Sequence, residues 1–196
     1  MTIYDLKPKF QDLLRPIVKK LNNKGITPNQ VTLFAFIISI IGGIIVYTQN
    51  LLLIAISLPI ILFVRMALNA IDGMLAREHN QMTKNGAIFN EMGDIFSDVV
   101  IFLPFILFVN PLLVTIFIII SISTEFIGVL GKAFYDKRVY TGPFGKSDRA
   151  FGIGVISILI YLKEYNFIEY IFYFMIILSI ITVWNRYKEL QKIEEK

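Results

Sequence analysis

The chain has 196 residues, of which 56% are hydrophobic and 17% are charged, and its formal net charge is +4 at pH 7. This composition excludes an ordinary soluble domain and indicates an integral membrane protein. Cysteine is absent, which excludes disulfides and thiolate metal sites. We therefore expect a lipid bilayer, and no nucleic acid, as the partner of this chain.

The N-terminal segment 1–26 combines apolar and basic residues at helical spacing. Apolar side chains recur with a helical period from Ile3 to Leu21, among four lysines and one arginine. We expect an amphipathic helix that lies along the anionic inner leaflet, and the alternative is a solvated leader that only sets topology. An early apolar core with a small-residue cleavage site is missing, so we expect no cleaved signal peptide.

Six apolar stretches are long enough, or nearly so, to cross a bilayer. Their bounds are 29–48, 51–76, 86–109, 112–131, 148–165 and 167–185. The predicted fold is all-α: an integral membrane protein with six transmembrane helices and an N-terminal amphipathic interfacial helix. We divide it into a cytoplasmic juxtamembrane segment (1–26), a six-helix transmembrane domain (27–185) and a charged cytoplasmic tail (186–196).

Local signals mark where the spans begin and how they are oriented. Thr27 and Pro28 form an N-cap followed by a first-turn proline, and Asn110-Pro111 predicts a tight turn. Lysine and arginine gather before the first span, after the second, between the fourth and fifth, and after the sixth. The positive-inside rule therefore predicts cytoplasmic N- and C-termini in a cytoplasmic (inner) membrane.

Polar side chains recur at helical spacing through the second and third predicted spans. At about 100° per residue, one helix stripe holds Asn69, Asp72, Gly73 and Ala76. In the next span, one helix face holds Asn90, Asp94 and Asp98, which recur at every fourth position. Glu91 lies within roughly 100° of this face. Polar groups are costly inside a bilayer, so this pattern indicates a functional site. Two acid-lined helix faces that meet predict a bound cation.

The spacing resembles the signature of the CDP-alcohol phosphatidyltransferases, membrane enzymes whose motif reads D-x2-D-G-x2-A-R-x8-G-x3-D-x3-D. The chain matches six of its eight fixed positions, which are Asp72, Gly73, Ala76, Arg77, Gly86 and Asp94. Asn69 and Asn90 stand where the family has its first and third aspartates. The start of the first span, Gly25 to Thr32, and the number of spans are also similar to this family. The resemblance covers nearly the whole chain.

The resemblance implies transfer of a phosphatidyl or related phosphoalcohol group from a CDP-linked lipid, such as CDP-diacylglycerol, to an acceptor alcohol, with release of CMP, in phospholipid biosynthesis. It also implies Mg²⁺ or Mn²⁺, hard cations that neutralise phosphate charge, and a homodimer. In the family, three aspartates hold the metals, and the fourth is proposed to take a proton from the acceptor hydroxyl. The implied catalytic residues are Asp72, Asp94 and Arg77.

The resemblance also gives two sets of binding residues. The metal-binding set is Asn69, Asp72, Asn90 and Asp94, to which we add Glu91 and Asp98 because both lie near the same helix face. The set that binds the CDP-lipid or the acceptor is Gly73, Ala76, Arg77, Lys146 and Arg149. Each asparagine keeps a carbonyl oxygen but removes one negative charge, so a weaker or single-metal site is the simplest consequence, unless Glu91 and Asp98 restore that charge. The alternative register, with Asp94 and Asp98 as the final pair, would misplace Gly86.

Three further charged features have open interpretations. Arg65, deeper in the second span, pairs with Asp98 or contacts a lipid phosphate. Glu125, within the fourth span, pairs with Arg65 or touches the acceptor alcohol. The basic cluster between Lys132 and Arg149 binds a phosphate or only sets topology. Two rival functions also remain, a non-catalytic or weakly active CDP-lipid binder and a small transporter, although a transporter does not explain the motif spacing.

Overall fold

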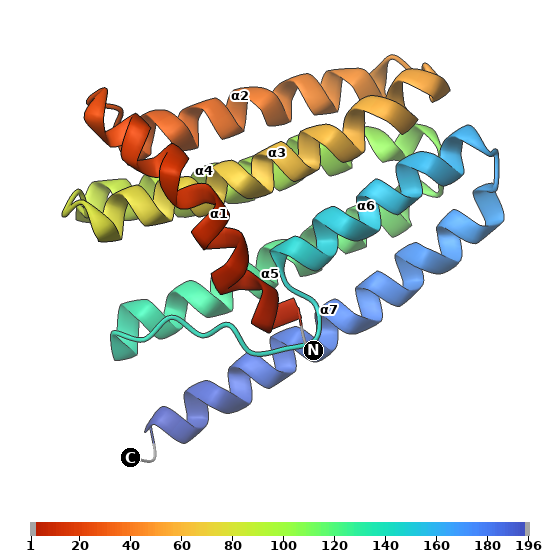
Figure 1. Cartoon of the computed structure of the whole chain (residues 1–196). Helices are drawn as coiled ribbons and strands as arrows, with labels where there is room; N and C mark the ends of the chain where they lie inside the picture. Colours follow the sequence, from red (N-terminus) through yellow and green to blue (C-terminus); the bar gives the residue numbers. More distant parts are fainter. Residues whose placement is uncertain (1–2, 195–196) are drawn as a thin grey trace.

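The computed structural model describes residues 3–194, with side chains from Pro8 onward, and this part of the chain folds into helices without a strand (Figure 1). The elements, in chain order, are α1 (Ile3–Asn23), α2 (Pro28–Tyr47), α3 (Leu51–Glu78), α4 (Lys84–Phe102), the 3-10 helix η1 (Leu103–Leu107), α5 (Pro111–Tyr135), α6 (Lys146–Tyr161) and α7 (Tyr165–Glu194). Helices α2 to α7 run alongside one another in alternating directions, and α1 lies across them (Figure 1). The predicted all-α class is confirmed.

Side-chain caps start the long helices where the sequence predicts. Thr27 Oγ1 accepts from the backbone N–H of Gln30, whose side chain accepts from Thr27 N–H, so α2 begins with a complete capping box and Pro28 in its first turn. Asn110 caps α5 by accepting from the N–H of Leu112, directly before Pro111. Local hydrogen bonding therefore determines these two helix starts.

Two helix bounds differ from the predicted spans. The predicted span 86–109 is broken, because α4 ends at Phe102 and Pro104 lies in the 3-10 turn that follows. Proline lacks an N–H and disfavours α-helical backbone in the residue before it, which explains this break. Helix α7 continues through the predicted tail to Glu194, because charged residues do not end a helix that lacks a breaker.

Within residues 3–194, four helices are long and apolar enough to cross a membrane, namely α2, α3, α5 and α7. Helix α4 has 19 residues but carries acidic side chains along its length, and α6 has 16 residues. The structure is therefore that of a membrane protein with four such helices. The predicted count of six spans stays a prediction.

Two apolar clusters hold the helices together. The larger one includes residues of every helix from α2 to α7 and contains three buried rings. The Phe117 ring centroid lies 5.2 Å from that of Phe102 in a tilted contact and 5.4 Å from that of Phe172 in an edge-to-face contact. In the smaller one, Leu14 and Val18 of α1 are buried against the motif-bearing end of α3. Helix α1 is therefore attached to the part of α3 that carries Asp72.

Candidate active site

The motif side chains of α3 and α4 meet across the two helices through reciprocal hydrogen bonds. Asn69 Nδ2 donates to Asp94 Oδ1 at 2.8 Å, and Asn90 Nδ2 donates to Asp72 Oδ2 at 2.8 Å. Each helix thus supplies one amide and one carboxylate, and each amide is bonded to the carboxylate of the other helix. The structure brings together the four motif positions that the Gly86 register predicts.

Helix α2 contributes a hydroxyl to this site. Thr32 Oγ1 donates to Asp72 Oδ2 at 2.8 Å, and both groups are buried. Helix α2 packs against α3 and α4, which brings the first turns of α2 to the motif. The motif spacing does not predict Thr32 as a site residue, although Thr32 lies in the Gly25 to Thr32 segment that resembles the family.

Glycine and alanine positions of the motif keep the helix faces open. A Cβ at Gly73 would lie 3.1 Å from Arg77 Nη1, so the glycine lets this guanidinium lie against the α3 backbone. Arg77 itself is exposed at the end of α3, and Ala76 is half-buried. A Cβ at Gly86 would lie 3.0 Å from Asn29 Oδ1, so this glycine allows α4 to approach α2 closely.

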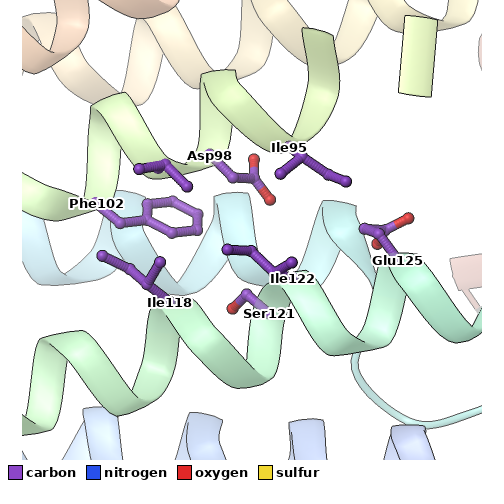
Figure 2. A pocket seen from close by; sticks show the side chains of 8 residues that line it. Ile95, Asp98, Phe102, Ile118, Ser121, Ile122 and Glu125 are labelled. Atoms are coloured by element: carbon purple, nitrogen blue, oxygen red, sulfur yellow. The ribbon is translucent and has the colours of Figure 1, made fainter. Parts of the chain in front are cut away.

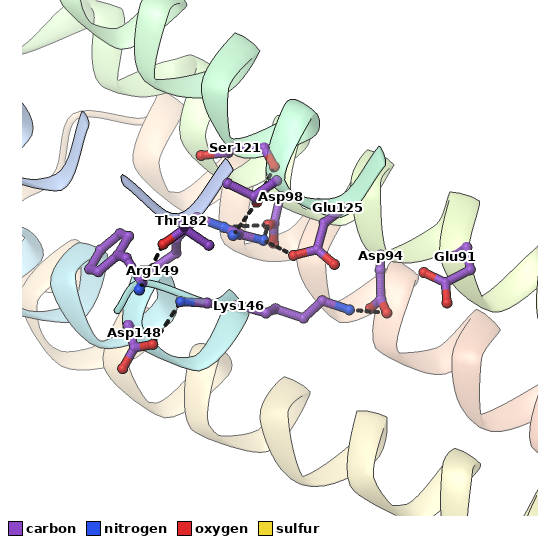
Figure 3. A network of polar contacts seen from close by, with 12 residues as sticks. Glu91, Asp94, Asp98, Ser121, Glu125, Lys146, Asp148, Arg149 and Thr182 are labelled. Carbon is purple, nitrogen blue, oxygen red and sulfur yellow. Dashed lines mark hydrogen bonds and ion pairs between the residues drawn. The ribbon is translucent and has the colours of Figure 1, made fainter. Parts of the chain in front are cut away.

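Lys146, the first residue of α6, reaches the acidic pair from the other side. Its Nζ forms a short ion pair with Asp94 Oδ2 (Figure 3). The Lys146 side chain is 27% exposed, whereas the Asp94 side chain is 9% exposed. The predicted site residue Lys146 is therefore at the motif, and it contacts a motif carboxylate.

A buried network of alternating charge lies beside the motif. Asp98 binds Arg65 at 2.5 Å. Asp98 also binds Arg149 at 3.0 Å, and Arg149 binds Glu125 Oε1 at 2.8 Å (Figure 3). Arg138, in the loop before α6, continues the network to Glu125 at 2.8 Å and to Glu91. Three arginines face three carboxylates, so the network is neutral. The predicted Arg65–Asp98 pair is confirmed.

These pairs bear on three sequence-based expectations. Asp98 is neutralised by Arg65 and Arg149, and Glu91 is neutralised by Arg138, so their role as replacement metal ligands stays a prediction. Glu125 pairs with Arg149 and Arg138 in place of Arg65. Helical spacing locates residues on one helix, but it does not show which charges other helices bring to them.

The basic residues before and at the start of α6 are each paired with an acid. Arg149 is fully buried, and its guanidinium donates to Asp98, Glu125 and Thr124. At the surface, Lys132 pairs with Asp136 and Lys137 with Glu189. Arg149 therefore has three protein partners in this structure, and its phosphate contact stays a prediction.

A small cavity lies between α4 and α5 at the edge of the charge network (Figure 2). Its volume is about 10 Å³, and Asp98, Ser121 and Glu125 line it together with apolar side chains. A space of this size holds about one water molecule. It is too small for a nucleotide or an acyl chain, so substrates must approach the motif from elsewhere.

The oxygen atoms at the motif are suitable ligands for a hard divalent cation, although their total negative charge is lower than that of the family motif. Within residues 3–194, no group of three or more acidic or histidine side chains is arranged for a metal. Asp72 and Asp94 nevertheless offer carboxylate oxygens, and rotation of the Asn69 and Asn90 amides would present two carbonyl oxygens. Oxygen ligands of this kind suit Mg²⁺ or Mn²⁺.

Known proteins resemble this chain over most of its length. The sequence profile described as CDP-alcohol phosphatidyltransferase matches residues 25–184. The chain is 43% identical over 190 residues to the inner membrane protein YnbA of Escherichia coli (strain K12), an alignment that covers 95% of this chain and 94% of that protein. The chain belongs to the CDP-alcohol phosphatidyltransferase family. Membership confirms the predicted enzyme class and its function, CDP-lipid headgroup transfer in phospholipid synthesis.

Two further similarities agree with this family. The archaetidylinositol phosphate synthase of Pyrococcus horikoshii is 37% identical over 93 residues, or 47% of each chain. The phosphatidylinositol phosphate synthase of Mycobacterium tuberculosis, solved with CDP-DAG bound, has a TM-score of 0.71 at 20% identity and covers 89% of this chain and 92% of that one. Its structure with manganese and citrate has a TM-score of 0.70, again at 20% identity, and covers 90% and 88%. The structural similarity confirms the fold.

Proposed function

We propose that the protein transfers a phosphatidyl or related phosphoalcohol group from a CDP-diacylglycerol-like donor to an acceptor alcohol, with release of CMP and with Mg²⁺ or Mn²⁺ as cofactor. The observation that carries this proposal is the meeting of Asp72 and Asp94 across α3 and α4, in a chain of this family. The CDP-DAG and manganese found in the similar synthase support the donor and the cation.

Each motif residue has a role in this proposal. Asp72 and Asp94 would hold the cation, with the amide oxygens of Asn69 and Asn90 as further ligands, and a bound cation would supply positive charge for the pyrophosphate. Arg77 binds a donor phosphate beside the small residues of α3. The acceptor oxygen bonds to the donor phosphorus while the bond from that phosphorus to CMP breaks. The hydroxyl proton passes to Asp94, through a carboxylate oxygen that does not bind the cation.

We also propose the membrane arrangement that places this site at the cytosol. Helices α4 and α6 bring the number of spans to six. Helix α4 packs against α2, and α6 packs against α3 and α7, so both lie beside helices that are long enough to cross the membrane. Both termini are cytoplasmic, and α1 lies at the inner surface of a cytoplasmic membrane. The protein is a homodimer, as the family resemblance implies.

One observation favours a second candidate, a CDP-lipid binder with little or no turnover. The Asn69 and Asn90 amides donate to the two carboxylates that would hold a metal. If they stay in this orientation when the lipid binds, the donor is held without a fully coordinated cation. Release of CMP distinguishes the two candidates.

The test is CMP release by the purified protein from CDP-diacylglycerol, with glycerol phosphate, inositol, inositol phosphate, serine and lipid alcohols as acceptors. We expect release with one acceptor class in Mg²⁺ or Mn²⁺, and loss of release in excess chelator. Binding of CDP-diacylglycerol without CMP release from any acceptor would support the binder. Full activity in chelator would contradict the metal requirement.

A further inference from the structure

We infer that this site is built for one divalent ion and that the Lys146 ammonium supplies the second positive charge, beside Asp94. The inference rests on the proposed function, because it concerns the same pair of carboxylates. It assigns to Lys146 the role of a tethered cation in place of a phosphate contact. The four motif side chains and Lys146 carry the argument.

The charge of the site is the first step. The family motif has four aspartates, whereas this chain has two carboxylates and two neutral amides at the same positions. The ion pair of Lys146 with Asp94 reduces the net charge to −1. A second divalent ion would enter a site that is nearly neutral before the first one binds. The second ion would also lie close to the positive charges of the first ion and of the Lys146 ammonium. Like charges that are close together repel strongly where water is scarce.

The hydrogen bonds are the second step. Both oxygens of Asp94 already accept from nitrogen, Oδ1 from Asn69 and Oδ2 from Lys146. At Asp72, Oδ2 accepts from Thr32 and from Asn90. Nitrogen donors therefore occupy positions around the carboxylates where a second ion would otherwise find ligands. Rotation of the two amides frees oxygens for one ion but leaves the ammonium at Asp94.

The anchoring of Lys146 is the third step. It is the first residue of α6, and the N–H of Gly145 donates to Asp148 Oδ2 at 2.8 Å to cap this helix. One turn further, Arg149 binds Asp98 and Glu125, which keeps the start of α6 against α4 and α5. The positive end of the helix dipole adds to the charge of the ammonium. Lys146 is thus held at Asp94 by the fold.

The test measures Mn²⁺ binding to the purified protein, without donor or acceptor, by isothermal titration and electron paramagnetic resonance. We expect one ion per chain, with the spectrum of isolated Mn²⁺. Lys146→Met should bind Mn²⁺ roughly tenfold more tightly, because a like charge is removed. The triple variant Asn69→Asp, Asn90→Asp and Lys146→Met should bind two ions with a spectrum of coupled Mn²⁺.

Two control variants make the same chemical changes away from the carboxylates. Lys84→Met removes a lysine from the first position of α4, and Asn85→Asp adds a carboxylate next to it, and both positions are exposed. Neither should change the number of ions bound or the affinity. Thermal unfolding of each variant checks that it is folded.

Several results would overturn the inference. Two Mn²⁺ ions bound per wild-type chain would do so without any variant. Weaker Mn²⁺ binding by folded Lys146→Met would show that the lysine positions Asp94 and is not a competing cation. Two bound ions together with CMP release would leave the proposed function standing, whereas one bound ion without CMP release from any acceptor would contradict that function alone.

Discussion

The Asn69 and Asn90 side chains fix the two motif carboxylates of this protein in place. Each amide donates across α3 and α4, so Asp72 and Asp94 have defined orientations through protein contacts. These hydrogen bonds are lost when the amides rotate to present their oxygens to a cation, so binding of the ion exchanges one set of carboxylate contacts for another. The asparagines therefore lower the charge of the site, and in this structure they hold its two carboxylates in place.

The Arg65–Asp98 pair gives a prediction about stability. Asp98→Asn leaves Arg65 without a carboxylate partner in a buried site and should lower the free energy of unfolding by roughly 3–5 kcal/mol. Arg65→Met leaves Asp98 paired with Arg149, so its cost should be smaller. The double variant removes both charges of the pair, so its cost should be smaller than the sum of the two single costs. Thermal unfolding in detergent measures the three variants.

An exposed pair provides the control for this cycle. Lys132 and Asp136 are 3.0 Å apart, and their side chains are 59% and 98% exposed. The same changes there, Lys132→Met and Asp136→Asn, should each lower the free energy of unfolding only slightly. The effect of the double variant should equal the sum of the two single effects. Additive costs at Arg65 and Asp98 would contradict a coupled buried pair.

Spacing along one helix was sufficient to predict the residues of the motif. Asn69, Asp72, Asn90 and Asp94 meet as the Gly86 register predicts, because helical geometry fixes which residues share a face. The contacts of Thr32 and Lys146 depend on how α2 and α6 pack against the motif helices. No pattern within a single segment contains that information.

At the scale of elements, helix starts were easier to predict than helix ends. Thr27 and Asn110 carry their capping groups in the local sequence. The break after Phe102 follows from Pro104, whose effect a count of apolar residues overlooks. The extension of α7 to Glu194 shows that a change from apolar to charged residues marks the end of a span and not the end of a helix.

Helix α1 gives a prediction at this scale. Leu14 and Val18 are buried against the bundle, Leu13 is 72% exposed, and Lys19 lies on another exposed side. We expect Leu13 to face the lipid and Lys19 to face water. The chain has no cysteine, so a nitroxide can be attached singly at Leu13→Cys or Lys19→Cys. In liposomes, oxygen should relax the first label more and a water-soluble nickel complex the second. Equal accessibility would contradict an interfacial α1.

At the scale of the whole molecule, the charge network joins segments that are distant in sequence. Arg149 of α6 binds Asp98 of α4 and Glu125 of α5, and Arg138 of the loop binds Glu91 and Glu125. Each charge alone indicates an intramembrane functional site, and only the tertiary arrangement shows that these neutralise one another. The sequence predicted the Arg65–Asp98 pair across two spans, but it did not predict the partners of Glu125 and Arg149.

The proposed topology gives a prediction about accessibility. Met82, between α3 and α4, should face the cytosol, and Glu164, between α6 and α7, should face the opposite side. In intact bacterial cells, a membrane-impermeant maleimide should label Glu164→Cys and spare Met82→Cys until the cells are lysed. The reverse pattern would contradict the six-span arrangement with cytoplasmic termini.

The central claim is that the Asp72–Asp94 pair performs phosphotransfer from a CDP-linked lipid. The most direct measurement is CMP release from CDP-diacylglycerol by the wild type, by Asp72→Asn and by the exposed control Asp136→Asn. We expect Asp72→Asn to lower the rate by about 10²-fold or more, because a cation ligand and its charge are lost, with an unchanged unfolding midpoint. Asp136→Asn should match the wild type. Wild-type rates in folded Asp72→Asn would contradict the account.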